Sequence, residues 1–176
     1  MRKIILTVFA ATSLLLYSTQ SFALVNFSLG VPLSHSFSAS DAAESDGVSG
    51  FFIQVGLPLL PGIGMDSYKT KIKDSTLELE TMIYNLYYQL PIPIINLTLG
   101  VGAGSTELQC TVCADLFDKG TATQWYASLG MPIIPLFDLH LSYRSVSSKI
   151  KIKDSAGGGE SDVGGNVMGL GIGFNF

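Results

Sequence analysis

The last segment of the chain, residues 164–176, constrains the fold more than any other. Its sequence, GGNVMGLGIGFNF, places an apolar side chain at every second position from Met168 to Phe176, with mostly glycine between them. A period of two residues is typical of a β-strand whose two faces meet different surroundings. A strand of a soluble sandwich would usually carry charge on its second face, whereas this one is almost bare. The pattern favours a strand with lipid on one face and a crowded barrel interior on the other.

Seven earlier segments are read as strands of the same kind, the third being the least regular. They are residues 25–34, 50–57, 63–73, 77–90, 95–104, 123–131 and 137–144. Within the first, Pro32 cannot donate to a ladder, so we expect a bulge or an irregular pairing there. Short turns bounded by proline (58–61, 91–93 and 132–135) alternate with polar loops (38–47, 74–76, 108–120 and 153–163), all but the second of them longer. Eight such strands predict an all-β fold, an eight-stranded antiparallel up-and-down transmembrane β-barrel.

Composition agrees with a barrel that faces lipid. The chain is 47% hydrophobic and 14% charged, against about 25% charged residues in ordinary globular proteins. Its formal net charge is −4, and it has no basic cluster large enough to follow a phosphate backbone. We therefore expect no nucleic-acid partner.

The first residues predict a leader rather than part of the fold. Arg2 and Lys3 precede a mostly apolar run from Ile4 to Leu16, and Ser21-Phe22-Ala23 supplies a small-x-small exit. This pattern is typical of a secretory signal peptide. We expect a signal peptide at residues 1–23 and one barrel domain at 24–176.

Together these features resemble the small eight-stranded outer-membrane proteins of the OmpX and OmpA-barrel type, whose closing strand typically ends in Phe, as this one does at Phe176. The resemblance implies the outer membrane of a Gram-negative bacterium, periplasmic termini and external loops. Outer-membrane lipid and lipopolysaccharide are then the expected surroundings. Members serve as anchors, adhesins, defence factors or lipid-modifying enzymes, so no single activity follows. We expect a non-enzymatic barrel that stabilises the membrane or acts through its external loops, with an unknown external partner.

An enzyme is the first alternative, because His140-Leu141-Ser142 resembles the His-x-Ser pair of outer-membrane lipid A deacylases. Nucleophilic catalysis needs a serine near a histidine base and an orienting carboxylate. Strand parity, however, points Leu139, Leu141 and Tyr143 toward lipid and therefore His140 and Ser142 inward. The asparagine that usually follows the serine is also replaced by Tyr143. The interpretation favoured here is a polar interior pair, with no catalytic residue.

The same parity groups four side chains on the inward face of one strand: Asp138, His140, Ser142 and Arg144. Further polar side chains are expected in the same interior, namely Asp66, Asn85, Tyr87, Gln89 and Gln124. Buried charges must be paired and hydrogen-bonded, so we expect a polar plug that holds the barrel shut. The alternative is a narrow channel in which Arg144 switches between carboxylate partners.

Cys110 and Cys113 form a CxxC in a loop. No second pair of ligands is at hand to complete a zinc site, so we expect no metal and no cofactor. An oxidising compartment favours a disulfide between the two. Reduced or lipid-modified cysteines are the alternatives.

Six lysines alternate near the loop ends of two strands: Lys69, Lys71 and Lys73, and Lys149, Lys151 and Lys153. Alternate residues of a strand stand about 6.6 Å apart on one side. Continuing the parity of residues 137–144 puts the second set on the outer face, just above the apolar stretch. Our hypothesis is that both sets bind lipopolysaccharide phosphates as point charges. The alternative is that they keep protruding strand ends soluble.

Overall fold

The computed structural model describes residues 25–38, 44–57, 59–90, 92, 95–110, 113–134, 136–154 and 157–176. The signal peptide predicted at residues 1–23 lies outside them. Within the described residues, no helix is long and apolar enough to cross a membrane.

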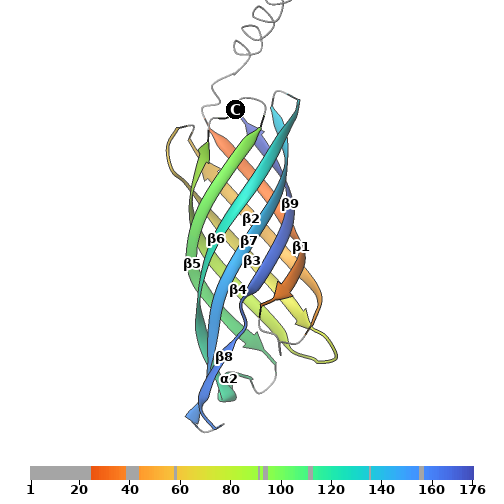
Figure 1. The fold of residues 1–176 in the computed structure, drawn as a ribbon, viewed down its shortest axis with the longest axis vertical. Helices are drawn as coiled ribbons and strands as arrows, with labels where there is room; N and C mark the ends of the chain where they lie inside the picture. Colours follow the sequence, from red (N-terminus) through yellow and green to blue (C-terminus); the bar gives the residue numbers. More distant parts are fainter. Residues whose placement is uncertain are drawn as a thin grey trace, which may run out of the picture.

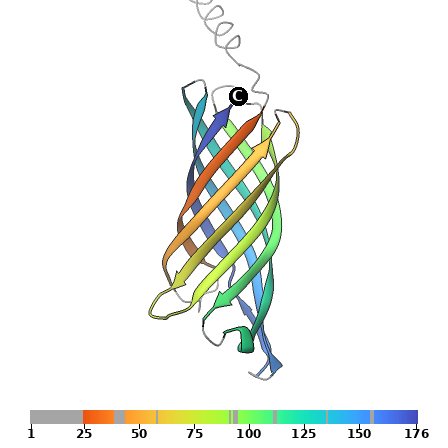
Figure 2. The same cartoon turned by 180° about the vertical axis from the view of Figure 1, so that it is seen from behind.

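The described chain forms a closed barrel of eight antiparallel strands (Figures 1 and 2). The wall consists of β1 (Asn26–Phe37), β2 (Ser45–Gly56), β3 (Gly62–Ile72), β4 (Glu78–Leu90), β5 (Asn96–Gln109), β6 (Phe117–Ile134), β7 (Phe137–Ile152) and β9 (Gly165–Asn175). Each strand pairs with the next along the chain, and β9 closes the ring against β1. A ninth short strand, β8 (Gly159–Asp162), pairs with the end of β7, and the one-turn helix α2 spans Cys113–Leu116. The predicted fold class is confirmed.

The two ends of the barrel differ. At the turn end, where β2 connects to β3, β4 to β5 and β6 to β7, Val25 and Phe176 exchange backbone hydrogen bonds of 3.1 and 3.0 Å. At the loop end β1 connects to β2, β3 to β4, β5 to β6 and β7 to β9, and α2 and β8 lie there (Figure 1). Both ends of the described chain therefore lie at the turn end.

Several strands run further toward the loop end than the sequence pattern predicts. β6 begins at Phe117 and has 18 residues, and β7 reaches Ile152 with 16. The prediction of a loop over 108–120 was therefore wrong at both of its ends, since residues 108–109 belong to β5 and 117–120 to β6. The outward apolar pattern stops there, but inward side chains such as Ala122 and Ile150 are still buried, at 1% and 0% exposure. The pattern marked the edge of the apolar belt rather than the end of the strands.

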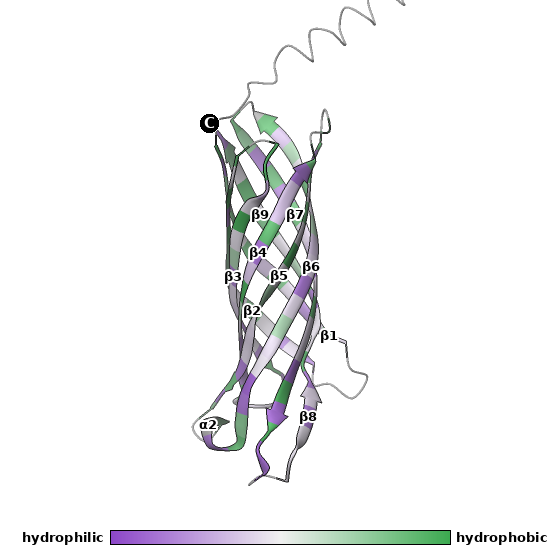
Figure 3. Cartoon of the chain, turned by 90° about the vertical axis from the view of Figure 1, so that its left-hand side faces the viewer, coloured by the Kyte–Doolittle hydropathy of each residue, from purple (hydrophilic) through white to green (hydrophobic). Residues whose placement is uncertain are grey.

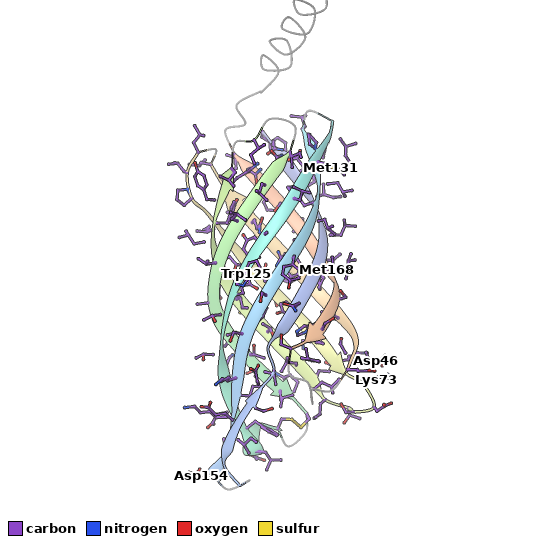
Figure 4. All side chains as sticks on the ribbon, viewed as in Figure 1. Asp46, Lys73, Trp125, Met131, Asp154 and Met168 are labelled. Carbon is purple, nitrogen blue, oxygen red and sulfur yellow. A yellow bond between two sulfur atoms is a disulfide. The ribbon has the colours of Figure 1, made fainter. Side chains whose placement is uncertain are left out.

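Side chains alternate between the wall's two sides as the period of two requires. Exposed apolar and aromatic residues cover the outside, among them Tyr84 at 63% and Trp125 at 53% exposure. Figure 4 shows Trp125, Met131 and Met168 projecting from the wall. Figure 3 shows hydrophilic colour gathered toward the loop end. The outside thus consists of an apolar belt and, at the loop end, a polar rim.

β1 is the irregular strand, as Pro32 predicted. Its pairing with β9 shifts register between Pro32 and Ser34, which confirms the expected bulge. The bulge reverses the alternation, so Ser34, predicted to face inward, is exposed, and His35 is buried at 4% exposure. Nδ1 of His35 then lies 2.8 Å from Oγ1 of Thr70 on β3.

Candidate functional site

An ion pair crosses the barrel interior at its centre. Nε of Arg144 on β7 donates to Oδ2 of Asp66 on β3 at 2.9 Å, and these side chains are 2% and 0% exposed. Strands β3 and β7 stand on opposite sides of the ring. Strand parity places both residues inward, and the narrow lumen of an eight-stranded barrel lets them meet across it.

Two aromatic rings enclose the Arg144 guanidinium. Its central carbon lies 3.5 Å from the centre of the Phe52 ring and 5.1 Å from that of Tyr126. A guanidinium stacked on a ring face is attracted by the ring's quadrupole, most strongly where water is excluded. The arginine is therefore held by a carboxylate and by two faces of aromatic carbon.

Amide side chains extend this network around the lumen. Nε2 of Gln124 lies 2.6 Å from Oδ2 of Asp66 and 2.6 Å from Oδ1 of Asn85. Nε2 of Gln54 donates to the Tyr126 hydroxyl at 2.8 Å. These contacts join five strands, β2, β3, β4, β6 and β7, at one level. We call Asp66, Arg144, Gln124, Asn85, Gln54 and Tyr126 the central network.

An apolar layer fills the lumen on the loop side of the central network. It consists of Phe52, Tyr68, Ile83, Ala122, Val146 and Val167. Five of these six stand two residues from a central-network residue on the same strand face, and Val167 stands two residues from Gly169, so parity alone places them next to the network on its loop side. The apolar layer leaves little that could hydrate a passing ion.

A second polar group lies toward the turn end and contains Asp138. Its Oδ2 accepts hydrogen bonds from Nδ2 of Asn96 at 2.5 Å and of Asn175 at 2.7 Å. Nδ2 of Asn26 in turn donates to Oδ1 of Asn175 at 2.6 Å. Nε2 of His140 is 4.0 Å from the same carboxylate oxygen. The four inward residues predicted on β7 thus belong to two different groups, with Asp138 at the turn end and Arg144 at the centre.

The geometry of His140 and Ser142 differs from that of a catalytic pair. The Ser142 hydroxyl accepts a hydrogen bond from Nη1 of Arg144 and lies 3.3 Å from the carbonyl oxygen of Gly169. Among the described residues, no hydrogen bond joins it to His140. The cavity beside them is about 20 Å³, enough for roughly one water molecule. A pocket for a drug-sized ligand is about 300–1,000 Å³, so no acyl chain fits here.

Two glycines make room for the His140 ring, and the sequence pattern alone did not identify their role. A Cβ on Gly173 of β9 would lie 2.2 Å from Nε2 of His140, and one on Gly130 of β6 would lie 2.7 Å from Nδ1. Register is the signal that could have found Gly130, the direct cross-strand neighbour of His140, whereas Gly173 pairs with Asp138. Gly130 and Gly173 therefore leave the space that the His140 ring occupies.

The loop end carries the lysines predicted to bind phosphate. Lys69, Lys71, Lys149 and Lys151 are exposed on the outside of β3 and β7, while Lys73 and Lys153 lie just past the strand ends. Four of the six stand within ion-pair distance of acids, most on neighbouring strands. The pairs are Lys69–Glu80 at 3.1 Å, Lys149–Glu160 at 3.8 Å, Lys153–Asp118 at 3.7 Å and Lys73–Glu44. The rim is therefore a mixed-charge surface rather than two purely basic rows.

The pair at Lys73 shows how these charges influence one another. The Lys73 ammonium donates a hydrogen bond to the Glu44 carboxylate. That hydrogen bond, with the attraction between the two charges, lowers the pKa of Glu44 and raises the pKa of Lys73. Both groups stay charged at neutral pH, and both side chains are exposed.

The two cysteines also lie at the loop end. Cys110 and Cys113 are joined by a disulfide between the end of β5 and the start of α2. Cys113 is 1% exposed. Among the described residues, no group of three or more His, Cys, Asp or Glu side chains could hold a metal ion.

No protein-family model matches this sequence, and no significant match was found among curated proteins. Solved structures do match. Neisserial surface protein A superposes with a TM-score of 0.58 and 14% identity, over 86% of this chain and 96% of that one. Outer membrane protein W of E. coli gives 0.55 and 10%, over 89% and 100%. Ail, the attachment invasion locus protein of Yersinia pestis, gives 0.51 and 16%, over 86% and 97%.

Identities this low show a shared fold. The closed ring of eight strands, with its apolar outside and polar rim, is that of the small outer-membrane β-barrels. The chain is such a barrel, and its location is the bacterial outer membrane. In barrels of this class the short turns usually face the periplasm and the longer loops the outside, so we expect the turn end to be periplasmic and the loop end external.

Proposed function

We propose that this protein is a non-enzymatic surface barrel, which stabilises the outer membrane or contacts a partner through its external rim. One observation carries the proposal. Among the described residues, every exposed charged side chain lies at the loop end, whereas the charged groups elsewhere, Asp66, Asp138 and Arg144, are buried. The groups available for recognition are therefore those of the rim.

The proposed partner of the rim is lipopolysaccharide, bound through its phosphates. Lys69 and Lys149 stand at the loop-end border of the apolar belt, the height at which we expect the lipopolysaccharide phosphates. Their acid partners are exposed enough that a phosphate could replace them, since Lys69 and Glu80 are 50% and 29% exposed. Surface ion pairs contribute only about 0–1 kcal/mol, so exchanging a carboxylate for a phosphate costs little. Lys71 and Lys151 are exposed as well.

The test compares two charge variants of the folded barrel in vesicles. The first replaces Lys69, Lys71, Lys73, Lys149, Lys151 and Lys153 by Gln. The second, a control matched in number, neutralises six rim acids: Glu78, Glu80, Glu107, Asp118, Glu160 and Asp162. Lipopolysaccharide affinity is measured against salt concentration with chelator present, so that no divalent cation bridges phosphate to carboxylate.

We expect the lysine variant to bind more weakly with a shallower salt dependence, and the acid variant to bind more tightly. Screening shortens the range of such contacts to about 8–10 Å at physiological salt. A lysine variant with the parent's affinity and salt slope would rule out the phosphate contact.

A second pair of measurements addresses the rest of the proposal. Purified barrel incubated with lipid A and phospholipid should release no acyl chains. Planar bilayers containing it should show no unitary conductance, because the central network and the apolar layer occupy the lumen. Acyl release lost in Ser142→Ala would establish a hydrolase, and stable conductance steps would establish a channel.

A further inference from the structure

The turn end carries an apolar collar that the proposed function does not use. Its exposed side chains include Leu59 at 59%, Ile133 at 67% and Phe176 at 65% exposure, with Leu60, Ile92 and Leu136 beside them. No charged residue occurs in the sequence from 47 to 65, from 81 to 106, from 120 to 137 or from 163 to 176. The turns are thus as apolar as the belt they join.

Proline is concentrated in the same three turns. Six of the chain's seven prolines stand at 58, 61, 91, 93, 132 and 135. A proline has no backbone N–H, so it leaves no donor to be satisfied. Two of the N–H groups that do occur there bond within their turns, Leu60 to Leu57 O at 3.2 Å and Ile92 to Leu90 O at 2.8 Å. In lipid every backbone polar group must be satisfied internally, and this chemistry reduces that demand.

The outward apolar residues of the strands alone do not reach the usual height of a lipid-facing belt, so apolar turns are needed to complete it. On β4 the charged outward residue nearest the turn end is Glu80, and the outward apolar side chains run from Met82 to Leu90. Eight steps at ~3.3 Å, tilted by ~40°, cover only about 20 Å along the membrane normal. The apolar band of such barrels is about 25 Å tall. The exposed apolar residues of the turns beyond the strand ends, such as Ile92 at 41% exposure, are the groups that remain to cover the missing height of about 5 Å.

From these three observations we propose that the collar is immersed in the periplasmic leaflet of the outer membrane, in contact with phospholipid. It continues the lipid-facing belt without a charged boundary, which makes phospholipid the occupant that the surface fits. The barrel is then displaced toward the periplasmic side of the membrane. Its longer strands, β6 and β7, carry the rim outward beyond the lipid on the other side.

The experiment uses the chain's one tryptophan. In a Trp125→Phe background, a new tryptophan is placed in the collar beside a turn, at the end of β6, as Ile133→Trp. A matched control places it beyond the end of β7 at the loop end, at an exposed position, as Asp154→Trp. Each barrel is folded into phospholipid vesicles at no more than one barrel per vesicle. Quenching by acyl-brominated phospholipid is compared with quenching by aqueous acrylamide, and circular dichroism confirms folding.

The turn tryptophan should emit at shorter wavelength than the rim tryptophan, lose most of its acrylamide quenching and be quenched by brominated lipid. Acrylamide quenching equal to that of the rim control would overturn the proposal by placing the collar in water. Shielding that appears only when protein is crowded in the vesicles would also overturn it, because a second copy rather than lipid would then cover the collar. The companion variant Ile92→Trp must give the same result, so the proposal does not depend on one substitution.

Discussion

The same chemical pair, a cation beside a carboxylate, occurs in this barrel in two surroundings. Arg144 and Asp66 meet in the lumen at 2.9 Å and are 2% and 0% exposed. Lys69 and Glu80 meet on the rim at 3.1 Å and are 50% and 29% exposed. The lumen pair is closed off from bulk solvent, whereas on the rim bulk water can replace a lost partner at once.

The two pairs show that polar groups have different roles in the lumen and on the rim. Burying a charge is expensive, so the lumen uses each charged group together with amides and aromatic faces that satisfy it. The rim exposes its charges in adjustable pairs, which leaves them available to a ligand. The buried groups at the centre hold the strands together, and the exposed charges of the rim are the ones that a ligand can reach.

Breaking the buried pair should have the largest effect on stability. Arg144→Met leaves Asp66 without its cation in a closed lumen, so we expect a loss of about 3–5 kcal/mol in the free energy of unfolding. Urea unfolding in vesicles, followed by tryptophan fluorescence, measures it. The double variant Arg144→Met with Asp66→Leu should recover much of that loss. A single variant as stable as the parent would mean that the buried pair does not hold the lumen.

A charge placed on the lipid side tests the wall between the two regions. Leu170 is exposed at 38% on the outside of β9, near the middle of the belt. Leu170→Arg should cost about 2–4 kcal/mol, the penalty for arginine at the midplane of such a barrel. Folding yield and urea midpoint in bilayers report it. Unchanged folding would show that the two faces of β9 are assigned the wrong way round.

A smaller effect is expected where a glycine accommodates a ring. Gly173→Ala brings a methyl group within 2.2 Å of Nε2 of His140 unless something shifts. Overpacking of this kind typically costs about 1–3 kcal/mol. In a His140→Ser background, where the ring is absent, Gly173→Ala should cost less stability than it does in the parent. If the two changes simply add, His140 is not what the glycine accommodates.

The rim pair should matter least to folding. Lys69→Gln is expected to change the free energy of unfolding by less than about 1 kcal/mol, because water and salt screen an exposed pair. The effect should shrink further at high salt. A loss comparable to that of Arg144→Met would erase the distinction between lumen and rim.

Strand parity determined a great deal from the sequence alone. It gave eight strands, the two faces of each, and the inward placement of Asp138, His140, Ser142 and Arg144. This was possible because the side-chain period of a strand is two and each face meets a different solvent. The turns and the bulge at Pro32 followed from the chemistry of proline.

The tertiary structure decided which of those side chains meet. Asp66 and Arg144 are 78 residues apart, and nothing in the alternation selects that pair over Asp138 with Arg144. Parity fixes a face, but tilt and register fix height along the lumen, and only groups at one height can bond across it. The same reason explains the rim, where register sets Lys69 beside Glu80 and converts a predicted basic row into ion pairs. The sequence determined what faces the lumen, and the closure of the barrel determined what each group finds there.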